Sequence, residues 1–288
     1  MASQHHIENP FEFVIEKLSW GAADIGKVIV PHPERHIGQA IPQVRKITMA
    51  DLGDVLCKAW GDIAATRDDI LFIGVVYPVA GLILVALASG HALLPMVFPL
   101  VSGFALLGPV AAVGLYEMSR RREGGAHVTW ADAFGVFSSP ALGSILGVGA
   151  ILLGLFALWL FAAYEINLAT LGPVVPPTLG AFEHDVFFTP AGRAVIVAGI
   201  GTGFLFALVA FAIGAVSFPL LLDRDVDMWI AIGTSFKAIA ANPGVMAAWA
   251  AIVVGLLVLG SLPALVGLII VMPLLGHATW HLYRKLVA

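Results

Sequence analysis

The sequence predicts an all-α polytopic membrane protein with six transmembrane helices and both termini in the cytoplasm. Its composition is 59% hydrophobic and only 12% charged, which is far from the average soluble domain. Long apolar runs recur along the chain, and the basic residues are distributed around them with a strong bias. Together these observations exclude a water-soluble fold.

Six apolar runs are close to the roughly 20 residues that cross a hydrocarbon core as a helix. We expect spans at residues 70–89, 93–116, 141–164, 191–222, 244–259 and 262–283. The predicted membrane domain is therefore 49–288. It follows a cytoplasmic N-terminal segment, 1–48, in which Phe11, Val14, Ile15 and Leu18 favour an interfacial helix.

The orientation of the spans follows from the positive charges. Seven Lys and Arg residues precede the first span, three follow the second, two follow the fourth and two follow the sixth. Fourteen of the fifteen therefore lie on one side, and only Arg193, at the start of the fourth span, lies on the other. Cytoplasmic loops are enriched in Lys and Arg, so we expect an N-in, C-in protein of the bacterial inner membrane.

Charge and cysteine content exclude further classes of protein. The net charge of −4 and the absence of a concentrated basic patch give no support to nucleic-acid binding. A single cysteine, Cys57, excludes an internal disulfide and a CxxC site. The N-terminus lacks the pattern of a cleaved signal peptide, so the first span is expected to act as the insertion signal.

A short stretch with helical apolar spacing precedes each pair of spans, which predicts three repeats of an amphipathic helix followed by a hairpin. The three apolar stripes are Leu52, Val55, Leu56, Ala59, Trp60 and Ile63; Trp130, Ala133, Phe134 and Phe137; and Trp229, Ile232, Phe236 and Ile239. Pro109, Pro219 and Pro273 recur in the later halves of the even-numbered spans. The alternative is six independent helices that share only membrane statistics.

Local signals place several helix ends. Thr129 with Asp132 predicts the start of the second amphipathic helix. The residues 138–140 (Ser-Ser-Pro) and 242–243 (Asn-Pro) predict breaks before the third and fifth spans. In the external loop, 165–190, we expect a short helix over 181–188 before Thr-Pro starts the fourth span.

The strongest candidate site is the Gly-His-Ala-Thr-Trp-His-Leu-Tyr-Arg segment that closes the sixth span. His277 and His281 are four residues apart and share one helix face, so they could ligate a metal or haem iron, or bind an anionic lipid headgroup with Arg284. Trp280 and Tyr283 complete this candidate ligand- or lipid-binding set. The alternative is that His277 bonds a neighbouring helix while the others form an interfacial belt. We expect no metal and no bound cofactor.

Other polar clusters favour ordinary surface roles. Glu183, His184 and Asp185 are adjacent, and adjacent side chains of a helix do not converge on one ion. The central parts of all six runs lack Asp, Glu, Lys and Arg, which counts against an ion-coupled pump. No nucleophile–base pair, P-loop or dinucleotide motif is present, so we do not expect an enzyme.

Three segments carry a resemblance to a known family: Phe218 to Asp227, Ala241 to Met246, and Gly276 to Arg284. Together they resemble an uncharacterised family of predicted integral membrane proteins from Proteobacteria, a domain of unknown function. The likeness extends from about Ile47 to the C-terminus. It implies the membrane fold and a bacterial inner-membrane location, and it brings no activity or cofactor.

Three functions remain open at this stage. The first is a non-catalytic accessory or assembly component, whose partners are the lipid bilayer and other membrane-protein subunits. The second is a channel or carrier for a neutral or apolar solute, which requires the scattered hydroxyls to converge; these belong to Ser102, Ser144, Thr202, Ser217 and Ser261. The third is a haem- or quinone-binding redox protein that uses His277 and His281.

Overall fold

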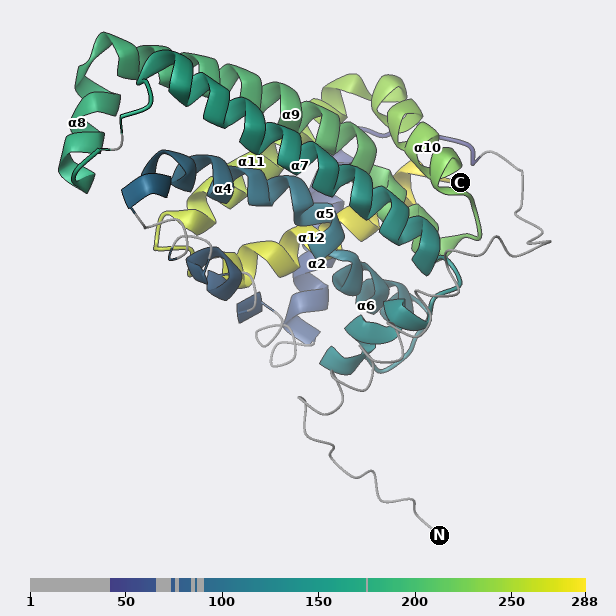
Figure 1. Cartoon of the computed structure of the whole chain (residues 1–288). Coiled ribbons are helices and arrows are strands. Elements are labelled where there is room, and N and C mark those ends of the chain that lie inside the picture. The colour runs from purple at the N-terminus through teal and green to yellow at the C-terminus, as the bar shows by residue number, and fades with distance from the viewer. Residues whose placement is uncertain (1–41, 66–73, 76–77, 84–85, 87–90, 175) are drawn as a thin grey trace.

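The computed structural model describes residues 42–65, 74–75, 78–83, 86, 91–174 and 176–288 (Figure 1). This part of the chain is helical, apart from an isolated antiparallel bridge between Val44 and Val287. The N-terminal interfacial helix and most of the expected first span, 70–89, lie outside the described residues.

The amphipathic segments and the long helices follow one another in the expected order. The α-helices are α2 (Met49–Ala65), α4 (Val97–Phe104), α5 (Gly108–Ala111), α6 (Val113–Glu123), α7 (Leu142–Thr170), α8 (Leu179–Phe188), α9 (Pro190–Asp223), α10 (Met228–Ala241), α11 (Pro243–Ser261) and α12 (Leu268–Leu286). The 3-10 helices are η1 (His91–Met96), η2 (Ala105–Leu107) and η3 (Trp130–Ser138).

Four helices of the described residues are long and apolar enough to cross a membrane. They are Leu94–Glu123, Leu142–Thr170, Pro190–Asp223 and Pro243–Ser261. These correspond to the expected second to fifth spans, and each extends beyond its predicted C-terminal limit. The bounds drawn from hydropathy were too short because the helices continue past the apolar run into polar ends such as 117–123 and 165–170.

The expected sixth span differs from the structure in its start and in its character. The chain turns at 262–267, where Ala264 and Leu265 have positive φ angles of 48° and 69°, so no helix runs through these residues. A Cβ on Gly267 would lie 2.7 Å from the backbone of Gly260, so this close approach requires glycine. Helix α12 starts only at Leu268. It is not among the four apolar helices, because the second half of its sequence contains polar residues.

The second span is segmented rather than continuous. Between His91 and Glu123 the chain alternates short 3-10 and α pieces, with Pro95 inside η1 and Pro109 at the start of α5. Proline lacks the amide hydrogen that would continue the helical bonding, which explains these interruptions. Pro219 and Pro273, by contrast, lie inside unbroken helices.

The predicted helix ends are confirmed where local chemistry set them. Thr129 and Asp132 form a reciprocal capping box, although η3 is a 3-10 helix and not the expected α-helix. Thr189 caps α9 by accepting a hydrogen bond from the amide of Gly192. Helix α10 ends at Ala241 and α11 begins at Pro243. The short helix expected over 181–188 is α8, two residues longer at its start.

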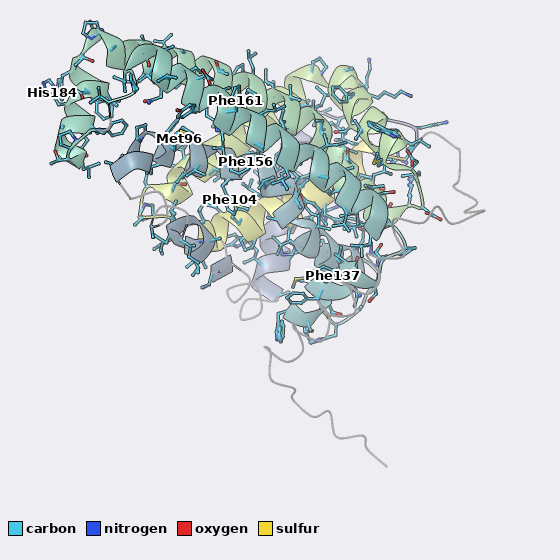
Figure 2. All side chains as sticks on the ribbon, in the orientation of Figure 1. Met96, Phe104, Phe137, Phe156, Phe161 and His184 are labelled. Carbon is cyan, nitrogen blue, oxygen red and sulfur yellow. The ribbon has the colours of Figure 1, made fainter. Side chains whose placement is uncertain are left out.

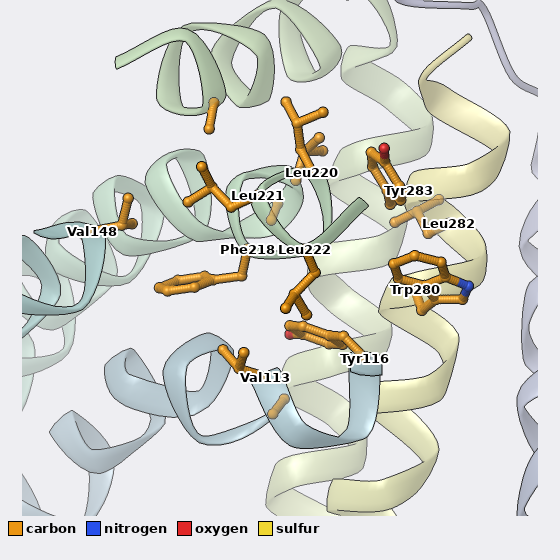
Figure 3. Packing of buried hydrophobic residues seen from close by; sticks show 14 of the residues in the cluster. Val113, Tyr116, Val148, Phe218, Leu220, Leu221, Leu222, Trp280, Leu282 and Tyr283 are labelled. Atoms are coloured by element: carbon orange, nitrogen blue, oxygen red, sulfur yellow. The ribbon is translucent and has the colours of Figure 1, made fainter. Parts of the chain in front are cut away.

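Each amphipathic segment packs on the C-terminal part of a long helix. Segment η3 packs on α6, α10 packs on α9, and α2 packs on α12, while α7 lies along α9 (Figure 1). The core between α6, α9 and α12 contains Tyr116, Phe218 and Trp280, each at most 2% exposed (Figure 3). The region where the C-terminal parts of α6, α9 and α12 meet is therefore the most tightly buried part of the bundle.

The outer part of α7 and α9, residues 153–170 and 190–209, is less buried within this chain than the core. Several of its side chains stay exposed within this chain: Phe161 on α7, labelled in Figure 2, is 62% exposed, and Phe204 on α9 is 61% exposed. Helix α8 closes this pair at the end remote from the C-terminus (Figure 1). Apolar exposure of this extent is expected of helices that are solvated by lipid.

Candidate functional site

The five candidate residues lie on α12, and three of them face the bundle interior. His277, Trp280 and Tyr283 are each 1% exposed. The indole of Trp280 donates to Glu123 at 2.9 Å, and the hydroxyl of Tyr283 donates to Asp223 at 2.5 Å. This burial contradicts the alternative in which Trp280 and Tyr283 form a belt against lipid.

Arg284 lies at the edge of the same site and is paired with two carboxylates. Its guanidinium is 3.1 Å from Glu123 and 3.3 Å from Asp223, and its side chain is 42% exposed. These ion pairs join the ends of α6, α9 and α12. Because both acidic partners already compensate its charge, the contacts do not specifically favour an anionic lipid headgroup; that role stays a prediction.

Asp62, on α2, is the centre of the polar site. Its Oδ2 accepts hydrogen bonds from Ser119 Oγ and His281 Nε2, each at 2.9 Å. Its Oδ1 is 3.2 Å from Arg122 Nε, and its main-chain oxygen accepts from Arg122 Nη1 at 3.0 Å. The carboxylate of Asp62 thus holds α2, α6 and α12 together. It bonds Ser119, which lies 57 positions later in the sequence, and His281, which lies 219 positions later.

The surroundings of Asp62 set its charge. Burial disfavours the ionised carboxyl, but the hydrogen bond from His281, the positive charge of the two histidine rings when protonated and the hydrogen bond from Ser119 keep its pKa below the usual value. Asp62 is therefore an anion at neutral pH, although its residue is only 8% exposed. A buried anion of this kind requires its partners.

His277 lies next to this carboxylate and is bound on one side only. Its Nδ1 is 2.6 Å from Ser119 Oγ and 3.7 Å from Asp62 Oδ2. Its Nε2 is buried and has no hydrogen-bond partner in the described part of the structure. His281, one helical turn later, is bonded through Nε2 to Asp62. The two rings therefore converge on Asp62 and not on an open position between them.

A second polar cluster fixes α6 to η3. Glu117, whose side chain is 3% exposed, accepts from Arg120 at 2.7 Å and from Arg121 at 2.6 Å. Arg121 also pairs with Asp132, the residue of the η3 capping box. Glu117 is thus a buried carboxyl group with two basic partners on its own helix, and one of them, Arg121, also reaches the neighbouring segment.

Lys285 makes the corresponding contact between α12 and α2. Its ammonium is 2.7 Å from Asp51 and 3.2 Å from Asp54. Asp51 also accepts from the amide and the hydroxyl of Thr48, both at 2.8 Å. The hydrogen bond from Lys285, followed by those from Thr48, lowers the pKa of Asp51 to about 2.

Residues 97–223 match the model of a family described as predicted integral membrane protein (DUF2189). With the four apolar helices, this match supports an integral membrane protein and brings no known function. The expected resemblance is confirmed at that level. The C-terminal segment, residues 276–284, lies outside the matched residues, as does the segment 241–246. No curated protein and no solved structure matches the chain.

Sequence reasoning identified the α12 side of the site and missed its partners on α2 and α6. Asp62 follows Val55 and Ala59 on the buried face of α2, so a carboxylate interrupts an apolar stripe. Glu117 and Ser119 similarly fall among buried positions of α6. Polar residues at positions with apolar periodicity were the signal that could have found all three.

The described part of the chain contains no preformed metal site. Within the described residues, no three His, Cys, Asp or Glu side chains are placed so that they could hold a metal ion. His184 and Asp185 on α8 are 3.7 Å apart and largely exposed, as expected for a surface pair. The polar groups around α12 are instead arranged as a hydrogen-bonded network.

Proposed function

We propose that this membrane protein is a non-catalytic accessory or assembly component of a larger membrane complex. Its buried polar side chains bind one another across helices, as Asp62 does with Ser119 and His281. Such contacts stabilise the bundle and leave few groups to bind a substrate. The protein then acts through its surface, which exposes large apolar side chains on α7, α9 and α11.

The observation that carries this proposal is the exposed outer part of α7 and α9, residues 153–170 and 190–209. The two helices have 29 and 34 residues, so at about 1.5 Å per residue each is longer than a hydrocarbon core of about 30 Å. Their outer parts contact α4 and α8 on some sides only. The remaining surface is available to a helix of another protein.

The side chains of this surface suit helix–helix association. Val197, Ile200 and Phe204 are 74%, 60% and 61% exposed on α9. Between them, a Cβ added to Gly199 or Gly201 would meet no atom within 4 Å, so another backbone can approach closely. In lipid, association depends on close van der Waals packing of this kind more than on hydrophobicity.

The contacts of the hydroxyl groups count against the channel alternative. Ser102 donates to Phe98, and Ser261 donates to Leu257, in each case a carbonyl four residues earlier on the same helix. Ser217 does the same with Ile213. The hydrogen of each of these three hydroxyls is used within its own helix, so it is not free to bind a solute on a shared polar path.

The haem or quinone alternative has one supporting observation, the unpaired Nε2 of His277. A haem bound there would give the purified protein an absorbance that disappears in His277→Ala. A colourless preparation would exclude the haem form of this alternative.

We place both termini on the cytoplasmic side of a bacterial inner membrane and retain three repeats as the proposed organisation. The packing supports a cyclic arrangement, because η3, α10 and α2 each pack on the last helix of a unit. Two of these contacts are ion pairs of the same kind: Arg121 pairs with Asp132, and Lys285 pairs with Asp51. In each pair the aspartate lies three residues after a threonine. Each basic residue lies twelve positions after Pro109 or Pro273.

Site-specific photo-crosslinking in native membranes tests the accessory function. A photoreactive amino acid at Phe204 is expected to crosslink to one partner protein, identified by mass spectrometry. The matched control is Val258 on α11, which is 56% exposed but lies on another helix. Lipid adducts alone at both positions would contradict the proposal, as would the same mixture of proteins at both.

A further inference from the structure

Helix α10 exposes an apolar face that the rest of the described chain leaves uncovered. Trp229 and Phe236 are 63% and 49% exposed, and their spacing of seven residues places them on one side of the helix. Ile232 and Gly233 lie between them and are half-buried. A Cβ added to Gly233 would meet no atom within 4 Å, so this side of the helix is open.

The opposite face of α10 is occupied by packing against α9. Ala231, Thr234, Ser235 and Ala238 are buried, and Ser235 Oγ accepts a hydrogen bond from the amide of Val216 at 3.3 Å. Burial against α9 therefore accounts for one side of α10 only. The exposed aromatic side chains on the other side need a different explanation.

The position of α10 in the chain places this face close to the membrane surface. Helix α9 ends at Asp223 and α11 begins at Pro243, and both are long and apolar enough to cross a membrane. Helix α10 connects them, so it lies where one membrane helix ends and the next begins. Trp and other aromatic side chains are enriched at that depth, with the ring among lipid headgroups.

Basic side chains without acidic partners lie beside the apolar face. Lys237 is on α10, which contains no acidic residue. Arg45 and Lys46 lie near the end of α10, because the side-chain amide of Asn242 donates to the main-chain oxygen of Arg45 at 3.0 Å. All three basic residues are exposed, and within the described residues none of them makes an ion pair. The chain itself therefore leaves this positive charge uncompensated.

The α10 surface consists of Trp229, Ile232, Gly233, Phe236 and Lys237, together with Arg45 and Lys46. We propose that this surface binds anionic phospholipids of the membrane in which the protein lies. The aromatic side chains enter the interfacial region, and the basic groups bind headgroup phosphates. Another protein could also cover the aromatic side chains, but uncompensated positive charge next to two membrane helices matches a layer of phosphates. The α10 surface is separate from the outer part of α7 and α9, so this proposal does not depend on the accessory function.

Electron paramagnetic resonance of a spin label at position 236 tests what covers the α10 surface. The chain has one cysteine, so Cys57→Ser with Phe236→Cys gives a single label in the full chain, reconstituted in nanodiscs of phosphatidylcholine and phosphatidylglycerol. We expect the label to collide with oxygen, which concentrates in lipid, more than with a water-soluble nickel chelate. The matched control is Val258→Cys in the same background, because Val258 is 56% exposed on the apolar helix α11.

Two other results of this measurement would contradict lipid binding. Greater access to the nickel chelate than to oxygen would place the α10 surface in water. Low access to both reagents would show that protein covers it. Either result would overturn the proposal.

Native mass spectrometry of the protein released from the same nanodiscs tests the role of the charges by counting bound lipids. We expect the wild type to retain phosphatidylglycerol in preference to phosphatidylcholine, and Lys46→Gln and Lys237→Gln each to lower this preference about fivefold. The matched control is Arg193→Gln, because Arg193 is also exposed and without an ion pair in the described structure but lies at the start of α9. No preference in the wild type, or lysine variants that behave as Arg193→Gln does, would overturn the proposal.

Discussion

Replacing Asp62 with alanine removes the carboxylate that joins α2, α6 and α12, and the cost can be worked from its contacts. The side chains of Ser119, His281 and Arg122 bond or pair with it, and the ring of His277 lies 3.7 Å away. Hydrogen bonds to charged groups contribute about 1.5–3 kcal/mol each, but Arg122 and His281 can regain water at the edge of the site. We therefore expect a loss of about 3 kcal/mol, within the range for breaking a buried ion pair.

The assay is unfolding of the protein in mixed micelles, followed by tryptophan fluorescence. Asp54→Ala is the matched control, because Asp54 lies on the same helix, its side chain is 64% exposed, and its contact with Lys285 is at 3.2 Å. An exposed pair contributes at most about 1 kcal/mol. Equal stabilities of Asp62→Ala and Asp54→Ala would refute the view that Asp62 fixes the three helices together.

Three further predictions follow from packing and charge. Phe218→Ala should destabilise the protein by about 3 kcal/mol in the same unfolding assay, since Phe218 is 0% exposed, whereas Phe204→Ala, at 61% exposure, should cost less than about 1 kcal/mol. Gly267→Ala should cost about 1–3 kcal/mol, because its Cβ would lie 2.7 Å from facing backbone; wild-type stability would show that the turn can open. The Asp51 pKa of about 2 is below its ordinary 3.8, so the pairing with Lys285 should contribute above about pH 4 and be lost as pH falls towards 2. Stability measured across that range should vary less in Lys285→Ala than in the wild type, and equal pH dependence would contradict the pairing.

Local chemistry made the helix ends predictable. The capping pair Thr129 and Asp132, the Thr189-Pro190 start of α9 and the Asn242-Pro243 break each act within a few residues, so the sequence alone was sufficient to place them. The four apolar helices were found for the same reason, since hydropathy is a property of contiguous residues.

The parts that were missed depend on contacts between distant residues. The partners of Asp62 lie 57 and 219 positions away, and no spacing rule connects them. The left-handed backbone at Ala264 and Leu265 was equally hidden, because neither residue favours that conformation. An apolar turn between two helices has the same hydropathy as a continuous span.

The structure also changed the interpretation of the candidate site. His277 bonds Ser119 of α6, which agrees with the alternative of a bond to a neighbouring helix. Trp280 and Tyr283 were expected at a ligand or lipid site or in an interfacial belt, and they are instead buried against α6 and α9. A side chain that is amphipathic serves equally at a lipid interface and in a hydrogen-bonded helix contact. The choice between these depends on the neighbouring helix, which the sequence does not specify. Whether these residues bind a ligand or lipid stays a prediction.

We propose that this protein functions by association with another membrane protein through the outer part of α7 and α9. Native mass spectrometry of the complex, extracted in mild detergent from its own membranes, tests it most directly. We expect one partner at a fixed stoichiometry, retained in Val258→Ala and reduced in Phe204→Ala. A protein that is always released alone, or a partner that both variants retain equally, would contradict it.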